Sequence, residues 1–330
     1  MLNVCVLTGT RADYGLLYLT LKELKSDKSI KLHLLATGTH LSKKHGHTYK
    51  EIESDGFKID SKINILSSKD DSKDISNITA KAIKGFSNYF SKNKIDLMII
   101  LGDRYEALAA AVSSTFHKIP ILHIHGGEIT EGAYDDMIRH AITKMSNYHV
   151  ATTNIHKKRI VQMGENPKNV KNFGAPGLEF IKKIKLLDKS NLSKKLGIEL
   201  EKFFVVTFHP ETLSPIPPKK QIKILLRSLS NFDNYKFLFS YSNADEGGNY
   251  IIKEIETFKR LHSDQVFIVP SMGQLIYLSA VANSNLVVGN SSSAIIEAPS
   301  LKKISVNIGE RQRGRVSADS VIHSSLNEKK

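Results

Sequence analysis

Cysteine is nearly absent from this sequence: Cys5 is the single one among 330 residues. One cysteine excludes an internal disulfide and a cysteine-based zinc site, and because Cys5 lies in an apolar run we expect it to be a small buried core residue. No apolar run approaches the roughly 18 residues that a transmembrane helix needs. Residues 1–8 lead straight into a strand-like run without the basic segment that opens a signal peptide. These absences predict a cytoplasmic protein with no membrane partner.

Acidic residues are fewer than basic ones. The chain has 47 Lys and Arg against 33 Asp and Glu, which gives a formal net charge of +14. Such an excess is a feature of nucleic-acid-binding proteins, but here the lysines are dispersed over the polar faces of helix-like segments, without a zinc-finger pattern, an RNP motif or a compact basic block. We therefore expect no nucleic-acid partner. The dispersed charge favours solubility, and it also attracts anionic small molecules such as nucleotides.

Hydrophobic residues make up 41% of the chain, which excludes a disordered or collagen-like protein. Short apolar runs alternate with longer amphipathic segments, and this order predicts the α/β class, with parallel sheets covered by helices on both faces. Residues 98–101 are apolar on both faces of their strand, as in buried parallel sheets. A break containing glycine and proline, near residues 174–177, divides the alternation into two halves.

We expect two Rossmann-like domains, 1–175 and 176–330, that face a cleft, because ligands of such sheets bind at the carboxyl ends of the strands. No closing helices follow the last expected strand, so we expect the second domain to be truncated at its C-terminus. The predicted strands are 4–7, 31–36, 97–101, 121–125, 149–152, 203–207, 236–240, 266–269, 286–289 and 304–306. The predicted helices are 15–24, 78–91, 106–116, 136–145, 154–163, 219–230, 250–258, 272–282 and 293–299.

A polar turn follows the first predicted strand. Arg11 stands at the start of the next helix, where backbone N–H groups and a guanidinium together suit an anion, and Gly9 allows close backbone approach. The alternative is an ordinary turn in which Thr10 or Asp13 caps the helix. The turn lacks the G-x-G-x-x-G pattern, which argues against a nicotinamide cofactor.

Charged residues also follow later strands of this half. Asp103 and Arg104 come directly after the strand expected at 97–101, either as site residues or as a helix cap and a surface arginine. Asp135 and Arg139 are either a plain helical i,i+4 pair or part of a group of carboxylates of the kind that proton abstraction and return require.

Two histidines lie on the strand expected at 121–125, where period-two alternation puts His123 and His125 on one face. A metal site is disfavoured because no third ligand is apparent, and a phosphate or a sugar hydroxyl explains the pair equally well. Glu128 follows two glycines that leave room for a ligand.

The second half carries a histidine and a serine run after its strands. Pro210 forces an extended exit from the strand expected at 203–207 and so presents His209 at the edge of the sheet. Ser291 and Ser292 precede the short helix expected at 293–299, where hydroxyls, N–H groups and the helix dipole converge on an anion. Glu297 is placed to bind a ribose diol.

Two further segments complete the candidate nucleotide site. Arg311 is the first of three arginines that follow the last strand, either to close on phosphate or as a solvated loop. Ser271 lies in the segment 270–274, whose backbone we expect to select the base.

Taken in order along the chain, these motifs resemble the UDP-N-acetylglucosamine 2-epimerase family and span nearly the whole sequence. The His-Gly-Gly-Glu run and residues 139–144 are similar to its hydrolysing branch, which feeds sialic acid and related nonulosonic acids. The family fold is a two-Rossmann arrangement of the GT-B type. The resemblance is carried by Gly9-Thr10-Arg11, Gly102-Asp103-Arg104, His123-Ile124-His125-Gly126-Gly127-Glu128, Ile138-Arg139-His140-Ala141-Ile142-Thr143-Lys144, Gly174-Ala175-Pro176-Gly177, His209-Pro210, Asn290-Ser291-Ser292-Ser293 and Glu297-Ala298-Pro299-Ser300.

The resemblance implies a role for each matching residue. Some members carry a glutamate where this chain has His125, so either His125 or Glu128 would act as an acid/base group beside Asp103. The implied catalytic set is Asp103, His125, Glu128, Asp135, Arg139 and His209. The implied substrate- and nucleotide-binding set is Arg11, Asp13, Arg104, Ser271, Ser291, Ser292, Glu297 and Arg311.

The chemistry implied by the resemblance needs no cofactor and no metal. A carboxylate removes the proton at sugar C2 while UDP leaves C1, and water then adds to the resulting glycal to give N-acetylmannosamine. The same chemistry on UDP-2,4-diacetamido-trideoxyglucose or GDP-N-acetylglucosamine is the alternative. We expect a nucleotide-sugar partner and a homodimer or homotetramer. A GT-B glycosyltransferase and a non-catalytic nucleotide-sugar-binding regulator are the rival hypotheses.

Overall fold

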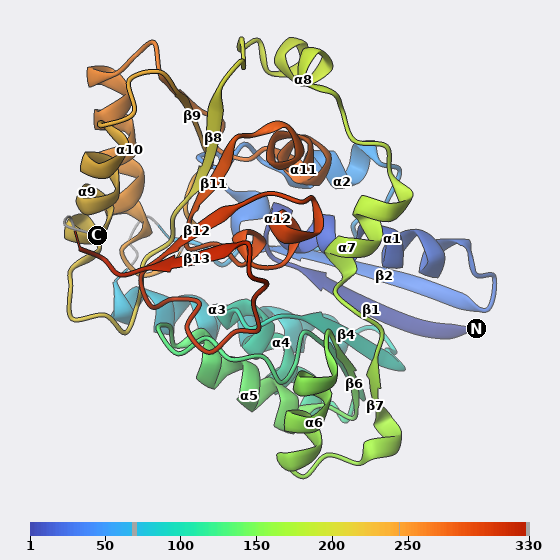
Figure 1. The fold of residues 1–330 in the computed structure, drawn as a ribbon. Helices are drawn as coiled ribbons and strands as arrows, with labels where there is room; N and C mark the ends of the chain where they lie inside the picture. Colours follow the sequence, from blue (N-terminus) through green and yellow to red (C-terminus); the bar gives the residue numbers. More distant parts are fainter. Residues whose placement is uncertain (68–70, 244, 328–330) are drawn as a thin grey trace. The chain divides into compact units, whose positions relative to one another are not determined.

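The computed structural model describes residues 1–67, 71–243 and 245–327. The chain forms two compact units (Figure 1). Unit 1 comprises Met1–Glu128 and Asp135–Pro176, and unit 2 comprises Ile129–Tyr134 and Gly177–Lys330. The short segment Ile129–Tyr134 thus belongs to unit 2, although the residues on either side of it belong to unit 1.

A parallel sheet forms the centre of unit 1. Within the described residues it has seven strands in the order β3-β2-β1-β4-β5-β6-β7, and the paired strands are parallel. The order reverses between β1 and β4, where loops leave the sheet in opposite directions and open a ligand position at its carboxyl edge. The strands are β1 (Leu2–Thr8), β2 (Ile30–Thr37), β3 (Ser61–Ile63), β4 (Leu97–Leu101), β5 (Ile121–Ile124), β6 (Tyr148–Ala151) and β7 (Val170–Asn172).

Both faces of this sheet are buried, because its strands alternate apolar side chains toward two separate cores. Cys5 and Leu7 of β1 pack with α3 and α4, while Val4 and Val6 pack with α1. Cys5 is a buried core residue, as the sequence predicted. The helices of this unit are α1 (Arg11–Ser26), η1 (Gly38–Leu41), α2 (Tyr49–Ser54), α3 (Ser72–Phe90), α4 (Tyr105–Phe116), α5 (Asp135–Met145), α6 (Asn154–Gln162) and η2 (Pro167–Asn169). Helix α7 (Pro176–Lys183) begins at the last residue of unit 1 and otherwise belongs to unit 2.

Unit 2 repeats this plan with a second parallel sheet. Its order among the described residues is β10-β9-β8-β11-β12-β13, again with parallel pairs. The reversal falls between β8 and β11, so the loops after these two strands define the ligand position of this sheet. The strands are β8 (Phe203–Thr207), β9 (Lys236–Phe239), β10 (Val266–Ile268), β11 (Leu286–Gly289), β12 (Ser305–Ile308) and β13 (Val321–Ser324).

Strand β8 shows how the second sheet is buried on both faces. Phe204 and Val206 face a core with α9 and α10, and Phe203 and Val205 face a core with α8 and α11. The helices of this unit are α8 (Lys189–Leu196), α9 (Pro218–Leu229), α10 (Gly248–Leu261), α11 (Gly273–Asn283), η3 (Ser292–Ala294) and α12 (Glu297–Ser300).

The observed architecture confirms the predicted α/β class with two parallel-sheet domains. The bounds of many predicted elements differ from the observed ones by one to several residues, and two of these differences concern the candidate site. Strand β5 ends at Ile124 rather than at residue 125, and the helix expected at 293–299 is a 3₁₀ turn followed by the four-residue α12. The short strands β3, β7 and β13 were not predicted, because three or four residues give little periodicity. No helix in the described part of the chain is long and apolar enough to cross a membrane.

Candidate active site

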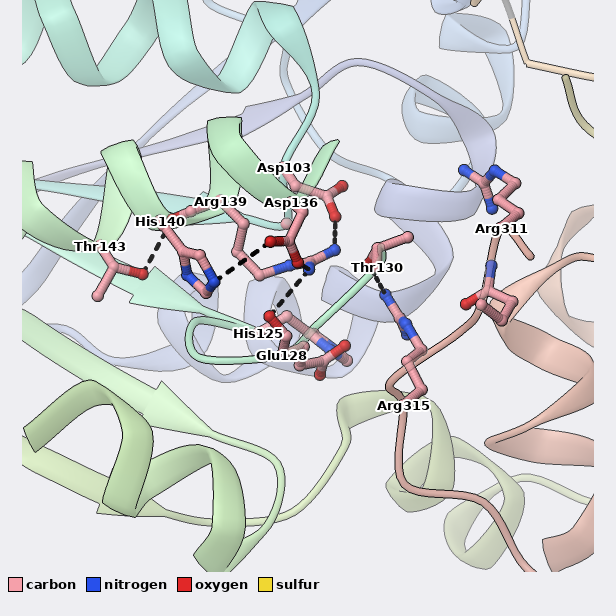
Figure 2. A network of polar contacts seen from close by, with 12 residues as sticks. Asp103, His125, Glu128, Thr130, Asp136, Arg139, His140, Thr143, Arg311 and Arg315 are labelled. Carbon is pink, nitrogen blue, oxygen red and sulfur yellow. Dashed lines mark hydrogen bonds and ion pairs between the residues drawn. The ribbon is translucent and has the colours of Figure 1, made fainter. Parts of the chain in front are cut away.

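A buried arginine organises the carboxyl edge of the first sheet. Arg139 of α5 is 1% exposed, and its guanidinium donates to the Asp103 carboxylate beyond β4 and to the backbone carbonyl of Glu128, 3.1 Å away. Asp136 lies one turn earlier on α5, 3.6 Å from the same guanidinium. Figure 2 shows these carboxylates gathered around Arg139. A guanidinium donates several hydrogen bonds in a fixed geometry and so orients the carboxylates that it contacts.

Asp103 does not cap a helix, which was the alternative left open by the sequence. The N-cap position of α4 is Arg104, and no side chain caps that end. Asp103 therefore turns to Arg139, 36 residues further along the chain. Asp135 is buried at the start of α5, so the structure brings Asp103, Asp135 and Arg139 to one edge of unit 1.

A histidine–glutamate pair lies next to this cluster (Figure 2). His125 Nδ1 is 2.6 Å from Glu128 Oε1, and both side chains are buried. The Thr152 hydroxyl also donates to Glu128 Oε1, at 3.0 Å, and lies 2.7 Å from His156 Nδ1. Glu128 is thereby fixed from two sides, and its carboxylate faces the imidazole of His125.

The two histidines that alternation placed on one face have different environments. His123 is inside β5, with Nε2 2.8 Å from the carbonyl of Gly102 and Nδ1 3.2 Å from the Thr143 hydroxyl. Burial lowers the pKa of His123 to about 4, so it is a neutral core histidine. His125 lies beyond the strand with a φ of 69°, and this left-handed conformation ends the alternation. Among the described residues no group of three or more His, Cys, Asp or Glu side chains is arranged to hold a metal.

The turn after β1 is fixed by a capping box. The Thr10 hydroxyl accepts from the N–H of Asp13, and the Asp13 carboxylate accepts from the N–H of Thr10. The predicted capping role of these residues is confirmed. Burial raises the pKa of Asp13 to about 6, although the nearby Arg104 guanidinium opposes the shift.

The two arginines predicted to bind substrate in unit 1 are each paired with a glutamate. Arg11 forms an ion pair with Glu51 of α2, and Arg104 Nε lies 2.7 Å from Glu106 Oε1. Glu106 is buried against Gly9, where a Cβ atom would collide with it. A glycine is therefore required at this position for the turn and the Arg104–Glu106 pair to coexist.

In unit 2 the loops after β8 and β11 are joined by one amide side chain. The Asn290 side chain accepts from the N–H of His209 at 2.7 Å and donates to the carbonyl of the same residue at 2.8 Å. The backbone N–H of Asn243 donates to His209 Nδ1 at 3.1 Å. Because Nδ1 is an acceptor, the proton of the neutral imidazole is on Nε2. His209 is thus fixed in a form whose Nε2–H can donate to an anion.

The serine run follows directly after Asn290. Ser291 caps the 3₁₀ turn η3, accepting from the N–H of Ser293, and Ser292 begins that turn. A turn of three residues has little macrodipole, so the anion site predicted here rests on hydroxyl and N–H groups. Glu297 is buried at the start of α12.

The arginine loop after β12 is anchored by Glu211, a residue that the sequence did not single out. The Glu211 carboxylate accepts backbone N–H groups of Glu310 and Arg311, at 2.8 and 3.2 Å, and burial raises its pKa. The Arg311 side chain donates to the carbonyl of Asn290 at 3.3 Å. Arg311 is thereby connected to the same loop that holds His209.

The segment Ile129–Tyr134 contacts this loop within unit 2. The N–H of Glu131 donates to the carbonyl of Arg313 at 3.2 Å, and Arg315 donates to the Thr130 hydroxyl at 3.4 Å (Figure 2). Ser271 lies in the loop between β10 and α11, as expected. Burial raises the pKa of Tyr277 of α11, and the Ser293 and Thr207 hydroxyls oppose this shift.

Several residues that take part in the contacts of the candidate site were not predicted from the sequence. Glu106 and Asp136 lie within three residues of the arginines that they contact, whereas the partners of most of the others are far away in sequence. The motif signal that found His209 and Asp103, a polar residue directly after a buried strand, does not apply to most of them. They are Glu106, Asp136, Thr152, His156, Glu211, Asn243, Tyr277 and Asn290.

Comparisons with known proteins agree with this architecture. The family described as UDP-N-acetylglucosamine 2-epimerase matches residues 22–330. A Campylobacter jejuni protein named GDP/UDP-N,N'-diacetylbacillosamine 2-epimerase (hydrolyzing) is 40% identical over 99% of this chain and 85% of its own. An Escherichia coli protein named polysialic acid biosynthesis protein P7 is 40% identical over 98% of this chain and 82% of its own.

Solved structures show the same fold. The UDP-GlcNAc 2-epimerase of Methanocaldococcus jannaschii, solved in complex with UDP-GlcNAc and UDP, has a TM-score of 0.81 and 19% sequence identity, covering 99% of this chain and 90% of that one. Fold and comparisons together define a two-sheet α/β enzyme of the GT-B-like type. The chain belongs to the UDP-N-acetylglucosamine 2-epimerase family.

Proposed function

We propose that this enzyme is a hydrolysing 2-epimerase that converts UDP-N-acetylglucosamine and water into N-acetylmannosamine and UDP. The observation that carries the proposal is the buried network in which Arg139 holds Asp103 and the Glu128 backbone, next to the His125–Glu128 pair. Epimerisation at C2 needs one group that takes a proton and another that returns one. A carboxylate fixed by a guanidinium and a carboxylate-bound imidazole, within one unit, are suited to these tasks.

In the first half of the reaction, the Asp103 carboxylate removes the proton from C2. The electron pair of that C–H bond forms a C1=C2 double bond, and the C1–O bond breaks, so UDP departs with its electron pair. Arg139 orients Asp103 throughout, and Asp135 is the further carboxylate at the same edge. The products of this half-reaction are a glycal and UDP.

We propose that residues of unit 2 stabilise the departing diphosphate. The Nε2–H of His209 donates to a diphosphate oxygen, and fixed donors of this kind stabilise charge that develops during a reaction. The remaining proposed contacts are to phosphate, ribose and base. They comprise Arg11, Asp13 and Arg104 of unit 1, and Ser271, Ser291, Ser292, Glu297 and Arg311 of unit 2.

A second substrate is favoured by a specific observation. The Campylobacter jejuni relative, 40% identical, is named for a diacetylbacillosamine sugar linked to GDP or UDP, whereas the Escherichia coli relative at the same identity is named for polysialic acid biosynthesis. The second candidate function is therefore the same hydrolysing epimerisation of a 2,4-diacetamido-trideoxy sugar. In either case we propose a role in making sialic-acid-type sugars, in the cytoplasm, by a homodimer or homotetramer.

The test is a side-by-side assay with three substrates: UDP-N-acetylglucosamine, UDP-2,4-diacetamido-trideoxyglucose and GDP-N-acetylglucosamine. Chromatography of the nucleotide and proton NMR of the sugar follow each reaction. Release of free nucleoside diphosphate together with the C2-epimeric free sugar supports the proposal, and the substrate with the highest kcat/KM identifies the sugar. Binding of UDP without release from any of the three sugars would contradict it and favour the regulator hypothesis.

A further inference from the structure

The contacts of Glu128 and His125 indicate that the two side chains have different roles. Glu128 Oε1 accepts from the Thr152 hydroxyl and lies 2.6 Å from His125 Nδ1, so the carboxylate is committed to contacts inside the protein. His125 Nε2, on the other side of the ring, is buried and has no hydrogen-bond partner among the residues that the structure describes. An unpaired buried imidazole nitrogen is costly unless a ligand or a reaction uses it.

The backbone around His125 is shaped to hold this orientation. His125 itself has a φ of 69°, a backbone conformation that residues other than glycine adopt at a cost in free energy. The next two residues are glycines, and a Cβ atom on Gly127 would collide with the carbonyl of His156. Arg159 donates to the carbonyl of Gly127. The loop thus keeps a strained histidine in place, which is a feature of functional sites.

We propose that His125 is the proton donor to C2 in the second half of the reaction and that Glu128 is its positioning residue. This inference rests on the proposed function and deepens it. In the proposed first half Asp103, paired with Arg139, takes the proton from one face of C2, so delivery of a proton to the opposite face needs a second group that carries one. An imidazolium whose Nδ1–H is bonded to a carboxylate is such a group.

The proposed step balances as follows. The C1=C2 electron pair of the glycal takes the proton from Nε2 of the imidazolium, forming the C2–H bond on the face opposite to the one that lost its proton. Water adds its oxygen to C1 and releases a proton to solvent, and Asp103 releases to solvent the proton that it took from C2 in the first half. His125 becomes neutral while its Nδ1–H remains on Glu128, and it regains a proton from solvent before the next turnover.

The test separates the two half-reactions. Wild type and H125Q are each given the UDP-sugar that wild type turns over, and separately the corresponding glycal with UDP. Glutamine fills a similar volume but does not transfer protons. We expect H125Q to release UDP and accumulate the glycal, and to hydrate added glycal at least about 100-fold more slowly.

Glu128 is tested by a double-mutant cycle. E128Q is expected to slow glycal hydration about tenfold with little change in KM, and the double variant H125Q/E128Q to be no slower than H125Q, because Glu128 acts through His125. A merely structural role would make the two effects additive. The matched control is H149Q, which alters another buried histidine of unit 1, 3.3 Å from Glu165, and is expected to hydrate the glycal at the wild-type rate.

The outcomes are distinct. Glycal hydration by H125Q at the wild-type rate overturns the inference and leaves the proposed function intact. Loss of UDP release in H125Q that still shows the wild-type circular dichroism spectrum also overturns it, because His125 is then required for elimination. Failure of wild type itself to release UDP from every sugar removes the proposed function, and the inference falls with it.

Discussion

The carboxyl edges of the two sheets are held together by different kinds of contact. In unit 1 the edge is made of charged side chains paired with one another, with Arg139 against Asp103 and His125 against Glu128. In unit 2 the amide of Asn290 joins His209 to the arginine loop, and the Glu211 carboxylate holds the backbone of that loop. Paired acids and bases can exchange protons, whereas fixed N–H donors and arginines bind an anion without losing a proton. We therefore propose different tasks for the two edges.

The largest expected effect comes from removing the charge at the centre of unit 1. R139M removes a buried guanidinium and leaves without a partner the Asp103 and Asp136 carboxylates, whose side chains are 20% and 26% exposed. We expect a loss of about 3 kcal/mol of folding stability, the lower end for a broken buried pair. Urea denaturation followed by circular dichroism measures it, and activity is expected to be lost as well. R260M, at an exposed arginine of unit 2, is the control. A loss below about 1 kcal/mol for R139M would show that its pairing is not structural.

The next largest effect separates chemistry from binding in unit 1. D103N keeps the size and most hydrogen bonding of the side chain but removes its basicity, so turnover is expected to fall about a thousandfold or more. The affinity for UDP, measured by calorimetry, is expected to stay within about threefold of wild type. E179Q, at an exposed glutamate of α7, serves as a control for a change of one charge. Turnover near the wild-type rate would remove Asp103 from the mechanism.

The corresponding change in unit 2 is expected to affect both quantities. H209A removes the Nε2–H donor, and loss of one such donor lowers kcat about 100-fold. Unlike D103N, it is also expected to weaken UDP binding, about tenfold. Steady-state kinetics and calorimetry on the same preparation test the contrast. If H209A changed kcat while UDP bound as before, the division of tasks between the two units would be wrong at this residue.

A smaller effect is expected from the amide that joins the loops of unit 2. N290A leaves the N–H and the carbonyl of His209 without their buried partner, which costs about 1–3 kcal/mol of folding stability. We expect weaker UDP binding, while hydration of added glycal changes less than it does in H125Q. Equal losses in both assays would contradict the comparison, because Asn290 lies in unit 2 only.

The smallest expected effect is a difference between the two units in how their folding stability changes as the pH falls. Burial lowers the pKa of His40 to about 3 and of His123 to about 4, whereas the unfolded chain binds these protons near pH 6.5. Unfolding therefore takes up protons below pH 6.5, and unit 1 loses about 1 kcal/mol per histidine between pH 6.5 and 5.5.

Glu211 in unit 2 and Asp13 in unit 1 make contributions of the opposite sign, because burial raises the pKa values of both carboxyl groups. Folding disfavours their ionised forms, so their contributions improve as pH falls, and Asp13 offsets part of the loss from the histidines of unit 1. Amide hydrogen exchange, corrected for the intrinsic pH dependence, follows each unit separately. Peptides of unit 1 are expected to lose protection first on acidification, and equal loss in both units would contradict this prediction.

The fold was predictable because the central strands are buried on both faces and so appear as apolar runs. Strands β4, β8 and β11 have the bounds expected from the sequence. The same reasoning located Asp103 and His209, since a polar residue that follows a buried strand lies at the carboxyl edge. These predictions needed only local sequence.

What was not predictable depends on contacts between distant residues or on a single backbone conformation. Alternation placed His125 with His123, but one left-handed residue ended the strand. The pairing of Arg139 with Asp103 and the inclusion of Ile129–Tyr134 in unit 2 depend on the tertiary fold. The serine run formed a 3₁₀ turn, capped by the Ser291 hydroxyl, instead of the continuous helix expected from the sequence.

The central claim is that unit 1 exchanges the C2 proton while the C1–O bond breaks. The most direct test is a turnover in water enriched in both deuterium and ¹⁸O, analysed by NMR and mass spectrometry of sugar and nucleotide. The account predicts a free sugar with deuterium at C2 and UDP that contains no ¹⁸O, since the nucleotide keeps the oxygen of the broken bond. A product that retains hydrogen at C2, or UDP that has gained ¹⁸O, would contradict it.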